Sequence, residues 1–258
     1  MMPKCRHEYS DQFMRLTRCF VSASLHAGDT LSLPESASVH ISRVLRARAG
    51  EALTLFNGQG GEHDAQILTI ERRSVRVRIG AHRAIERESP LKVTLLQALA
   101  RGERMDFIVQ KATELGVATI VALPAERSVV RLDAEGNKKR AEHLRAVAVS
   151  ACEQCGRNRV PNIELVSDLE SAIARSPGAD RRLLLAPEAE QTLVALAQQA
   201  QSVTLLIGPE GGLTAEELAA SVQHGFKNCR LGPRILRAET ASMTALSVIQ
   251  AMAGDLGQ

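Results

Sequence analysis

The sequence is poor in aromatic residues: it has one Tyr, five Phe and no Trp among 258 residues. A platform that stacks unpaired bases needs several exposed aromatic rings, so we do not expect one here. No window approaches the roughly 18 consecutive apolar residues of a membrane-spanning helix. The N-terminal residues also lack the apolar segment of a signal peptide, which predicts a cytoplasmic protein with no membrane partner.

Cysteine is also scarce and scattered, at positions 5, 19, 152, 155 and 229. An odd number with this spacing does not resemble a secreted disulfide framework, so we expect reduced thiols. Cys152 and Cys155 form one C-x-x-C pair, but a zinc site would need a second pair or a nearby His. The seven His residues form no H-x-H or H-x-x-x-H set. We therefore expect the two thiols to pack in the interior, and no metal site.

Charge is balanced overall but uneven along the chain, with a formal net charge of +3. Residues 1–87 contain 13 Lys and Arg against 9 Asp and Glu, whereas the remainder contains 19 against 20. Positive charge in the N-terminal third indicates a polyanionic partner there, although an ordinary solvated surface would carry a similar excess.

Short alternating runs dominate the N-terminal third: LTRCFV, EALTLFN, HDAQILTI and SVRVRIG, with turn residues such as NGQGG between them. They predict a small antiparallel β domain over residues 1–87. Between the first two runs, the spacing of Val39, Arg43 and Arg46 predicts a helix that begins at Ser36 or Ser38 and ends at Gly50.

From residue 88 onward, apolar strands alternate with amphipathic helices, which predicts an α/β domain over residues 88–258. Its mostly parallel sheet should be covered by helices on both faces. Lys111 and Glu114, on a helix expected over 102–115, have the spacing of a helical ion pair. The expected strands are VTLLQALA, VATIVALP, IELV, RLLLA, VTLLIG and a short one near 229–231, and further helices are expected over 137–155, from Asp168, over 190–200, from Thr214, and to about 253.

Two strands end in glycine–proline loops, LLIGPEGGL at 205–213 and LGPRILRAETAS at 231–242. Ligands of parallel sheets lie at the carboxyl ends of the strands, so these loops are candidate binding segments. In the first loop, Gly208, Gly211 and Gly212 permit close backbone approach and positive φ angles. Thr214 and Glu217 have the spacing of a capping box at the start of the next helix.

The charges of the two loops differ. Glu210, Glu216 and Glu217 make the first acidic, and the phosphate-binding patterns G-x-x-x-x-G-K-[ST] and G-x-G-x-x-G are absent. A neutral or cationic ligand such as S-adenosylmethionine fits better than a nucleotide, although a turn without a ligand explains this loop alone equally well. Arg234 and Arg237 make the second loop basic. They could bind a substrate, or they could be solvated or form an ion pair with Glu239.

The two loops, extended as LLIGPEGGLTAEEL and LGPRILRAETA, resemble the RsmE family of bacterial 16S rRNA uridine-N3 methyltransferases of the SPOUT class. RGERMDFIVQKATELGV, PAERSVV and ACEQCGRNRVP are similar to further motifs of that family, in the same order. HISRVLRARAG and LFNGQGGEHDAQI resemble its PUA-like domain, so the likeness extends from about residue 15 to the end. It implies an α/β SPOUT domain tied in a trefoil knot, an N-terminal PUA-like β-barrel, S-adenosylmethionine as cofactor, and a homodimer.

The same resemblance makes the two loops walls of one cofactor pocket. The residues implied on one side are Leu206, Ile207, Gly208, Pro209, Glu210 and Gly211, and those on the other are Leu231, Gly232, Ile235, Leu236, Arg237 and Thr240.

Methylation of uridine N3 requires an anionic uracil aligned with the sulfonium methyl group. Arg237 is the candidate that stabilises this anion, because a guanidinium offers fixed donors to a carbonyl edge. Glu239 is the candidate base or the residue that orients it. The candidate RNA-binding residues are Arg15, Arg18, Arg43, Arg46, Arg101 and Arg104, with Arg234 for a phosphate and with Glu153, Gln154, Arg157 and Asn158 for the substrate pocket.

The expected function is therefore methylation of N3 of uridine 1498 in 16S rRNA, with the rRNA or the small ribosomal subunit as partner and no role for DNA. Two alternatives stay open at this point. One is a SPOUT methyltransferase with another RNA target, such as a ribose 2′-hydroxyl, and the other is a non-catalytic RNA-binding protein that retained the fold.

Overall fold

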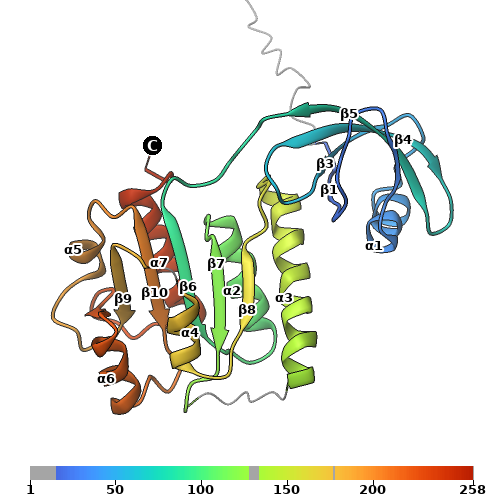
Figure 1. The fold of residues 1–258 in the computed structure, drawn as a ribbon. Coiled ribbons are helices and arrows are strands. Elements are labelled where there is room, and N and C mark those ends of the chain that lie inside the picture. The colour runs from blue at the N-terminus through green and yellow to red at the C-terminus, as the bar shows by residue number, and fades with distance from the viewer. Residues whose placement is uncertain (1–15, 128–133, 177, 258) are drawn as a thin grey trace, which may run out of the picture. The chain divides into compact units, whose positions relative to one another are not determined.

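The computed structural model describes residues 16–127, 134–176 and 178–257. Between Ile85 and Glu86 the chain divides into two compact units, each with its own apolar core (Figure 1). Among the described helices, none is long and apolar enough to cross a membrane.

The first unit is a five-stranded sheet in the order β1-β3-β4-β5-β2. Most of its pairs are antiparallel, as predicted, but β1 pairs with β3 in parallel. The purely antiparallel prediction is wrong there because the chain between these strands is long enough to make a crossover. The strands are β1 (Arg18–Phe20), β2 (Thr30–Ser32), β3 (Ala52–Phe56), β4 (Glu62–Ile70) and β5 (Val75–Arg83).

The helix of this unit is shorter than the sequence predicts and starts earlier. α1 (Glu35–Val39) follows Pro34, which provides no side-chain cap, and continues as a π-helical turn over His40–Val44. Ser38 is buried instead of capping: its Oγ donates to the Leu33 carbonyl at 3.2 Å and accepts from the Val75 amide at 3.1 Å. The helix ends before Gly50 because Arg46 adopts a φ of 52°, outside the helical region.

The second unit is built on a six-stranded sheet in the order β11-β9-β10-β6-β7-β8. Every strand pair in it is parallel, which confirms the predicted parallel sheet. The strands are β6 (Lys92–Ala98), β7 (Thr119–Leu123), β8 (Asn162–Leu165), β9 (Arg181–Leu185), β10 (Ser202–Ile207) and β11 (Lys227–Cys229).

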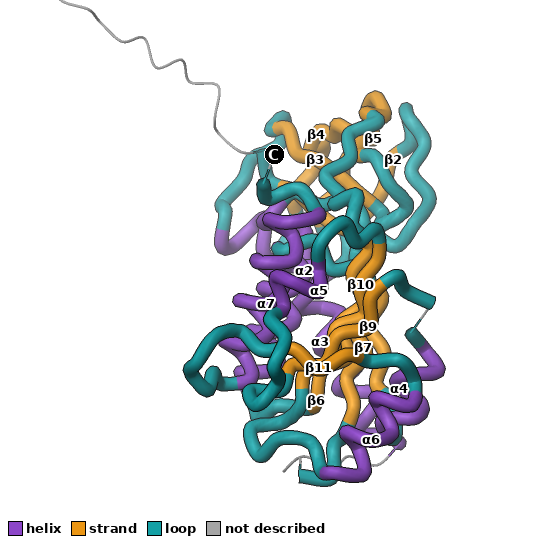
Figure 2. Tube along the Cα trace, turned by 90° about the vertical axis from the view of Figure 1, so that its left-hand side faces the viewer, coloured by secondary structure: helices purple, strands orange, loops and turns teal. Residues whose placement is uncertain are grey.

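Helices cover both faces of this sheet, as predicted (Figure 2). On β10, Leu205 faces one helical layer and Leu206 the other, because successive side chains alternate across a strand. Lys111 and Glu114 form the predicted ion pair at 2.8 Å. One layer contains α2 (Glu103–Glu114), α3 (Ala134–Cys155), α5 (Leu193–Ala197) and α7 (Ala238–Ala253), and the other contains α4 (Leu169–Arg175) and α6 (Ala215–Gln223).

Candidate functional site

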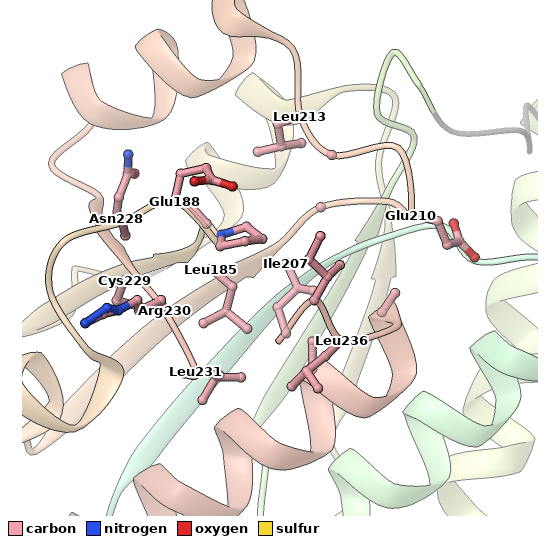
Figure 3. Close-up of a pocket in the computed structure, with 18 of the residues that line it drawn as sticks. Leu185, Glu188, Ile207, Glu210, Leu213, Asn228, Cys229, Arg230, Leu231 and Leu236 are labelled. Atoms are coloured by element: carbon pink, nitrogen blue, oxygen red, sulfur yellow. The ribbon is translucent and has the colours of Figure 1, made fainter. Parts of the chain in front are cut away.

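A cavity of about 490 Å³ opens where β9, β10 and β11 end (Figure 3). Three loops, the start of α7 and Leu218 of α6 line it, through residues 185–189, 207–213, 228–232, 234–236, 238 and 241. The two glycine–proline loops of the sequence therefore meet in one place, although about twenty residues separate them. Their meeting follows from the parallel sheet, whose strand ends share one edge.

The floor of the cavity is apolar. Leu185, Ile207, Leu231 and Leu236 contribute side chains from three strand ends and from the segment before α7 (Figure 3). Backbone groups of the glycine-rich loop border this surface. An apolar slot rimmed by a few polar groups is the usual form of a site for a small, partly aromatic ligand.

The first loop, GPEGG, needs its glycines for two different reasons. A Cβ at Gly208 would come within 3.1 Å of Leu213 Cγ, so a larger residue would crowd the loop against that side chain. Gly212 has a φ of 71°, which side-chain-bearing residues rarely adopt. The loop then enters α6 through the predicted capping box, in which Thr214 and Glu217 exchange hydrogen bonds of 2.8 and 3.2 Å.

Neighbouring segments hold this loop from outside. Arg104 of α2 donates from Nη1 to Glu210 Oε1 at 2.9 Å. Arg127, which follows β7, donates to the Gly211 carbonyl at 3.0 Å. The amide of Glu126 also donates to Glu217 Oε1 at 2.9 Å. The loop is thus fastened to the segments that follow two other strands of the sheet.

The acidic character expected of this loop does not extend into the cavity. Only Glu210 of the three glutamates lines it, and Arg104 pairs with that carboxylate. Glu216 and Glu217 line a separate hollow beside α4, since the capping box turns Glu217 toward Thr214. Hydrogen bonds from its own backbone amide and from the Thr214 hydroxyl lower the pKa of Glu216 below its usual range.

Most residues expected to hold the cofactor do line the cavity, but three do not. Leu206 is buried on the other face of the sheet, because its side chain alternates with that of Ile207. Arg237 is the residue before α7, and Thr240 lies on an exposed position of its first turn. Those that line the cavity are Ile207, Gly208, Pro209, Glu210, Gly211, Leu231, Gly232, Ile235 and Leu236.

Sequence reasoning missed the contribution of β9 and β11. The segments 185–189 and 228–230 also line the cavity, and they bring two charged side chains, Glu188 and Arg230. The strand RLLLA neighbours β10, so the rule that pointed to the loop after β10 applies equally to the loop after β9.

The start of α7 carries the residues expected to act on the substrate. Arg237 is exposed, and Arg234 is exposed while lining the cavity. Glu239 is half-buried, and its Oε2 is buried with no hydrogen-bond partner among the described residues. Ser242 Oγ donates to Gln97 Oε1 at 2.6 Å, which fixes the first turns of α7 to β6.

The candidates for RNA contacts separate into exposed and internal residues. Arg43, Arg46 and Arg101 are exposed, whereas Arg15 lies outside the described residues. Arg18 is mostly buried: its side chain is 11% exposed and pairs with the buried Glu62. Its guanidinium also lies 4.9 Å from the centre of the Phe56 ring, so an ion pair and a ring contact both hold this side chain.

Arg157 and Asn158, the candidates for the substrate pocket, are both buried. The Arg157 guanidinium donates to the carbonyls of Thr113 and Val117 at 2.8 and 3.0 Å and pairs with Glu88, so it joins α2 to the end of α3.

Glu153 is half-buried near the end of α3, and Gln154 is exposed there. Cys152 is fully buried, which agrees with the expected packing role, and Cys155 is partly buried. Within the described ranges, no three His, Cys, Asp or Glu side chains come close enough to share a metal ion.

Comparison with known proteins gives two family matches. Residues 87–250 match the model of an RNA methyltransferase domain, and residues 33–80 match that of an RNA methyltransferase PUA domain. A ribosomal RNA small subunit methyltransferase E of Buchnera aphidicola (subspecies Schizaphis graminum) is 33% identical over 242 residues, which cover 94% of this chain and 98% of the relative. The protein of the same name from Bacillus subtilis is 30% identical and covers 92% and 94%.

Solved structures agree with these matches. A Legionella pneumophila protein in complex with S-adenosylmethionine is 41% identical, with a TM-score of 0.89 over 94% of this chain and 100% of that one. A ribosomal RNA small subunit methyltransferase E from Neisseria gonorrhoeae, bound to S-adenosylmethionine, is 34% identical, with a TM-score of 0.85 over 93% and 99%.

Proposed function

The chain belongs to the ribosomal RNA small subunit methyltransferase E family, and from this we propose that it transfers the methyl group of S-adenosylmethionine to N3 of uridine 1498 in 16S rRNA. Its fold is that of the SPOUT class with an N-terminal PUA domain, as the sequence resemblance implies. The observation that carries the proposal is the cavity in which the two glycine–proline loops meet beside the start of α7.

The cavity suits the methyl donor. Its apolar floor can take the adenine ring, and the backbone of the glycine-rich loop can take the polar edge of that ring. Relatives that share this fold bind S-adenosylmethionine. When bound, the cofactor supplies an electrophilic methyl group on a sulfonium. The chain's own residues must then place the uracil ring in line with it.

Arg237 and Glu239 carry the proposed substrate chemistry. Uridine N3 loses its proton before or during transfer, and the resulting charge spreads onto the two uracil carbonyl oxygens. Arg237 lies exposed at the start of α7, where its guanidinium can donate to one of those oxygens. Glu239 Oε2 is buried without a partner among the described residues, and this carboxylate is the proposed acceptor of the proton, directly or through water.

RNA binding is assigned to basic residues of both units. Arg43 and Arg46 lie exposed in the PUA domain, and Arg101 lies exposed before α2. Their guanidinium groups suit phosphate contacts, which position an RNA without reading its sequence. Arg234 lines the cavity and is placed to hold a phosphate next to the target nucleotide.

The working unit proposed is a cytoplasmic homodimer. Ile235 lines the cavity, yet its side chain is 83% exposed, and a second copy packed against this edge would remove it from water. Sedimentation of the purified protein at micromolar concentration tests this, and a single species of the 27.9 kDa chain mass would refute it.

The function is tested by mapping 16S rRNA modifications by mass spectrometry in a strain that lacks the gene. The expected result is loss of one methyl group, on N3 of uridine 1498, and its return when the wild-type gene is supplied. Loss of a ribose methylation instead would favour another RNA target. An unchanged modification pattern would favour a non-catalytic RNA-binding protein.

A further inference from the structure

The cavity contains a carboxylate that has no partner within the described residues, that of Glu188. Glu188 follows β9, where its exposed side chain lines the cavity. The other carboxylate of the lining belongs to Glu210, and Arg104 already pairs with it at 2.9 Å. Of the two, Glu188 is therefore the acceptor that a ligand can engage without breaking an ion pair.

The position of Glu188 defines which part of a ligand it can reach. Figure 3 shows Glu188 and Leu236 on opposite sides of the apolar floor made by Leu185 and Ile207. Leu236 immediately precedes Arg237 and the start of α7. Glu188 thus lies on the wall away from the residues proposed to act on uracil.

This separation orients the cofactor. The sulfonium methyl must point toward the uracil, and therefore toward the start of α7. The adenosine part then lies over the apolar floor and toward the loop after β9. Ribose is bonded directly to adenine, so its two hydroxyls would lie at the rim of this floor when adenine lies on it. A carboxylate offers two acceptor oxygens to a neighbouring pair of hydroxyl donors.

We propose that Glu188 binds the 2′- and 3′-hydroxyl groups of the cofactor ribose. The inference rests on the proposed function, because it takes S-adenosylmethionine as the ligand of this cavity. Glu188 is accordingly a specificity residue for a ribonucleoside-type methyl donor. In this orientation the α-ammonium group of the cofactor would lie beyond the sulfur, on the α7 side and out of reach of Glu188.

The test compares Glu188→Gln with Glu190→Gln by calorimetry. Glu190 is an exposed acid of the same connection that does not line the cavity, which makes it a matched control. The ligands are S-adenosylhomocysteine and 5′-methylthioadenosine, which has the ribose but no amino-acid group. Glu188→Gln should lower the affinity for both ligands by about tenfold, which is the size expected for hydrogen bonds to a charged group. Glu190→Gln should bind both ligands with the wild-type affinity.

A second comparison isolates the ribose. Wild type should bind 2′,3′-dideoxy-5′-methylthioadenosine more weakly than the parent compound, and Glu188→Gln should show little of this difference. Equal affinities of wild type and Glu188→Gln for S-adenosylhomocysteine would overturn the assignment. So would a substitution that lowers the affinity for S-adenosylhomocysteine but not that for 5′-methylthioadenosine. If wild type itself bound no S-adenosylmethionine, the proposed function would fail and the inference with it.

Discussion

Arg104 Nη1 lies 2.9 Å from Glu210 Oε1, so the first turn of α2 is joined to the glycine-rich loop of the cavity. The two residues are separated by 106 positions in the sequence. Arg104 is therefore already engaged before any RNA arrives. Its charge neutralises the only one of the loop's three glutamates that lines the cavity.

Removing this ion pair should weaken cofactor binding only slightly. Both side chains are partly exposed, at 44% and 40%, and exposed ion pairs contribute about 0–1 kcal/mol. Arg104→Ala should therefore raise the Kd for S-adenosylmethionine by no more than about fivefold, and Arg101→Ala should leave it unchanged. Calorimetry without RNA measures both. A loss of a hundredfold would mean that Arg104 contacts the cofactor itself.

Arg237→Ala should severely slow methyl transfer while leaving cofactor affinity nearly intact. The side chain does not line the cavity, so its loss removes a donor to uracil and not to the cofactor. Loss of one donor to a developing oxyanion lowers turnover by about 100- to 1000-fold. Single-turnover rates on 30S subunits and the Kd for S-adenosylmethionine are measured together. Arg175→Ala, at an exposed position on α4, is the control, and near-normal turnover by Arg237→Ala would refute the assigned role.

Hydrophobic periodicity was sufficient to predict the parallel sheet and its two helical layers. Leu205 and Leu206 belong to one continuous apolar run, which is typical of a strand buried on both faces. The same run could not say which of its residues reaches the cavity, because that depends on the alternation of side chains about the sheet. Ile207 therefore lines the cavity, while the side chain of Leu206 lies on the other face of the sheet.

The sequence predicts least well which arginines are exposed and which are buried. Arg18 and Arg157 are candidates for RNA or substrate contact like the exposed Arg43 and Arg101, yet both are held inside by residues distant in the chain, Glu62 and Glu88. Burial of a charge depends on such long-range partners, which no periodicity reveals. Local sequence patterns also do not reveal the knot that the family resemblance implies, because a knot depends on the path of the whole chain.

Arg157→Ala should destabilise the protein without a direct effect on chemistry. Arg157 is 4% exposed and donates to Glu88 and to two backbone carbonyls, so truncation removes these hydrogen bonds and leaves the Glu88 carboxylate without this cation. Breaking a buried pair of this kind costs about 3–5 kcal/mol. Urea unfolding should show that loss, whereas Arg159→Ala, with an exposed ion pair to Glu86, should lose less than about 1 kcal/mol. An Arg157→Ala protein that is stable but has lost turnover would show that Arg157 acts on the substrate.

Cys229 should make the folded protein less stable as the pH rises above about 9. It ends β11 with its thiol fully buried, and burial raises the pKa of that thiol from 9.0 to about 12. Between these values the unfolded chain releases the thiol proton while the folded chain keeps it. The unfolded state then binds fewer protons, so the free energy of unfolding falls with pH, by up to about 1.4 kcal/mol per pH unit. Below pH 9 both states keep the proton, and the group has no effect.

Urea unfolding of wild type and Cys229→Ala at pH 8 and pH 10 measures this contribution. Cys229→Ala removes the titrating group and adds a small cavity, whose cost does not depend on pH. Wild type should therefore lose about 1 kcal/mol more than Cys229→Ala between the two pH values. The buried thiol should also react slowly with iodoacetamide at pH 8, because only the thiolate is nucleophilic. Equal losses in the two proteins, or rapid alkylation of folded Cys229, would show that its thiol ionises near the ordinary pKa.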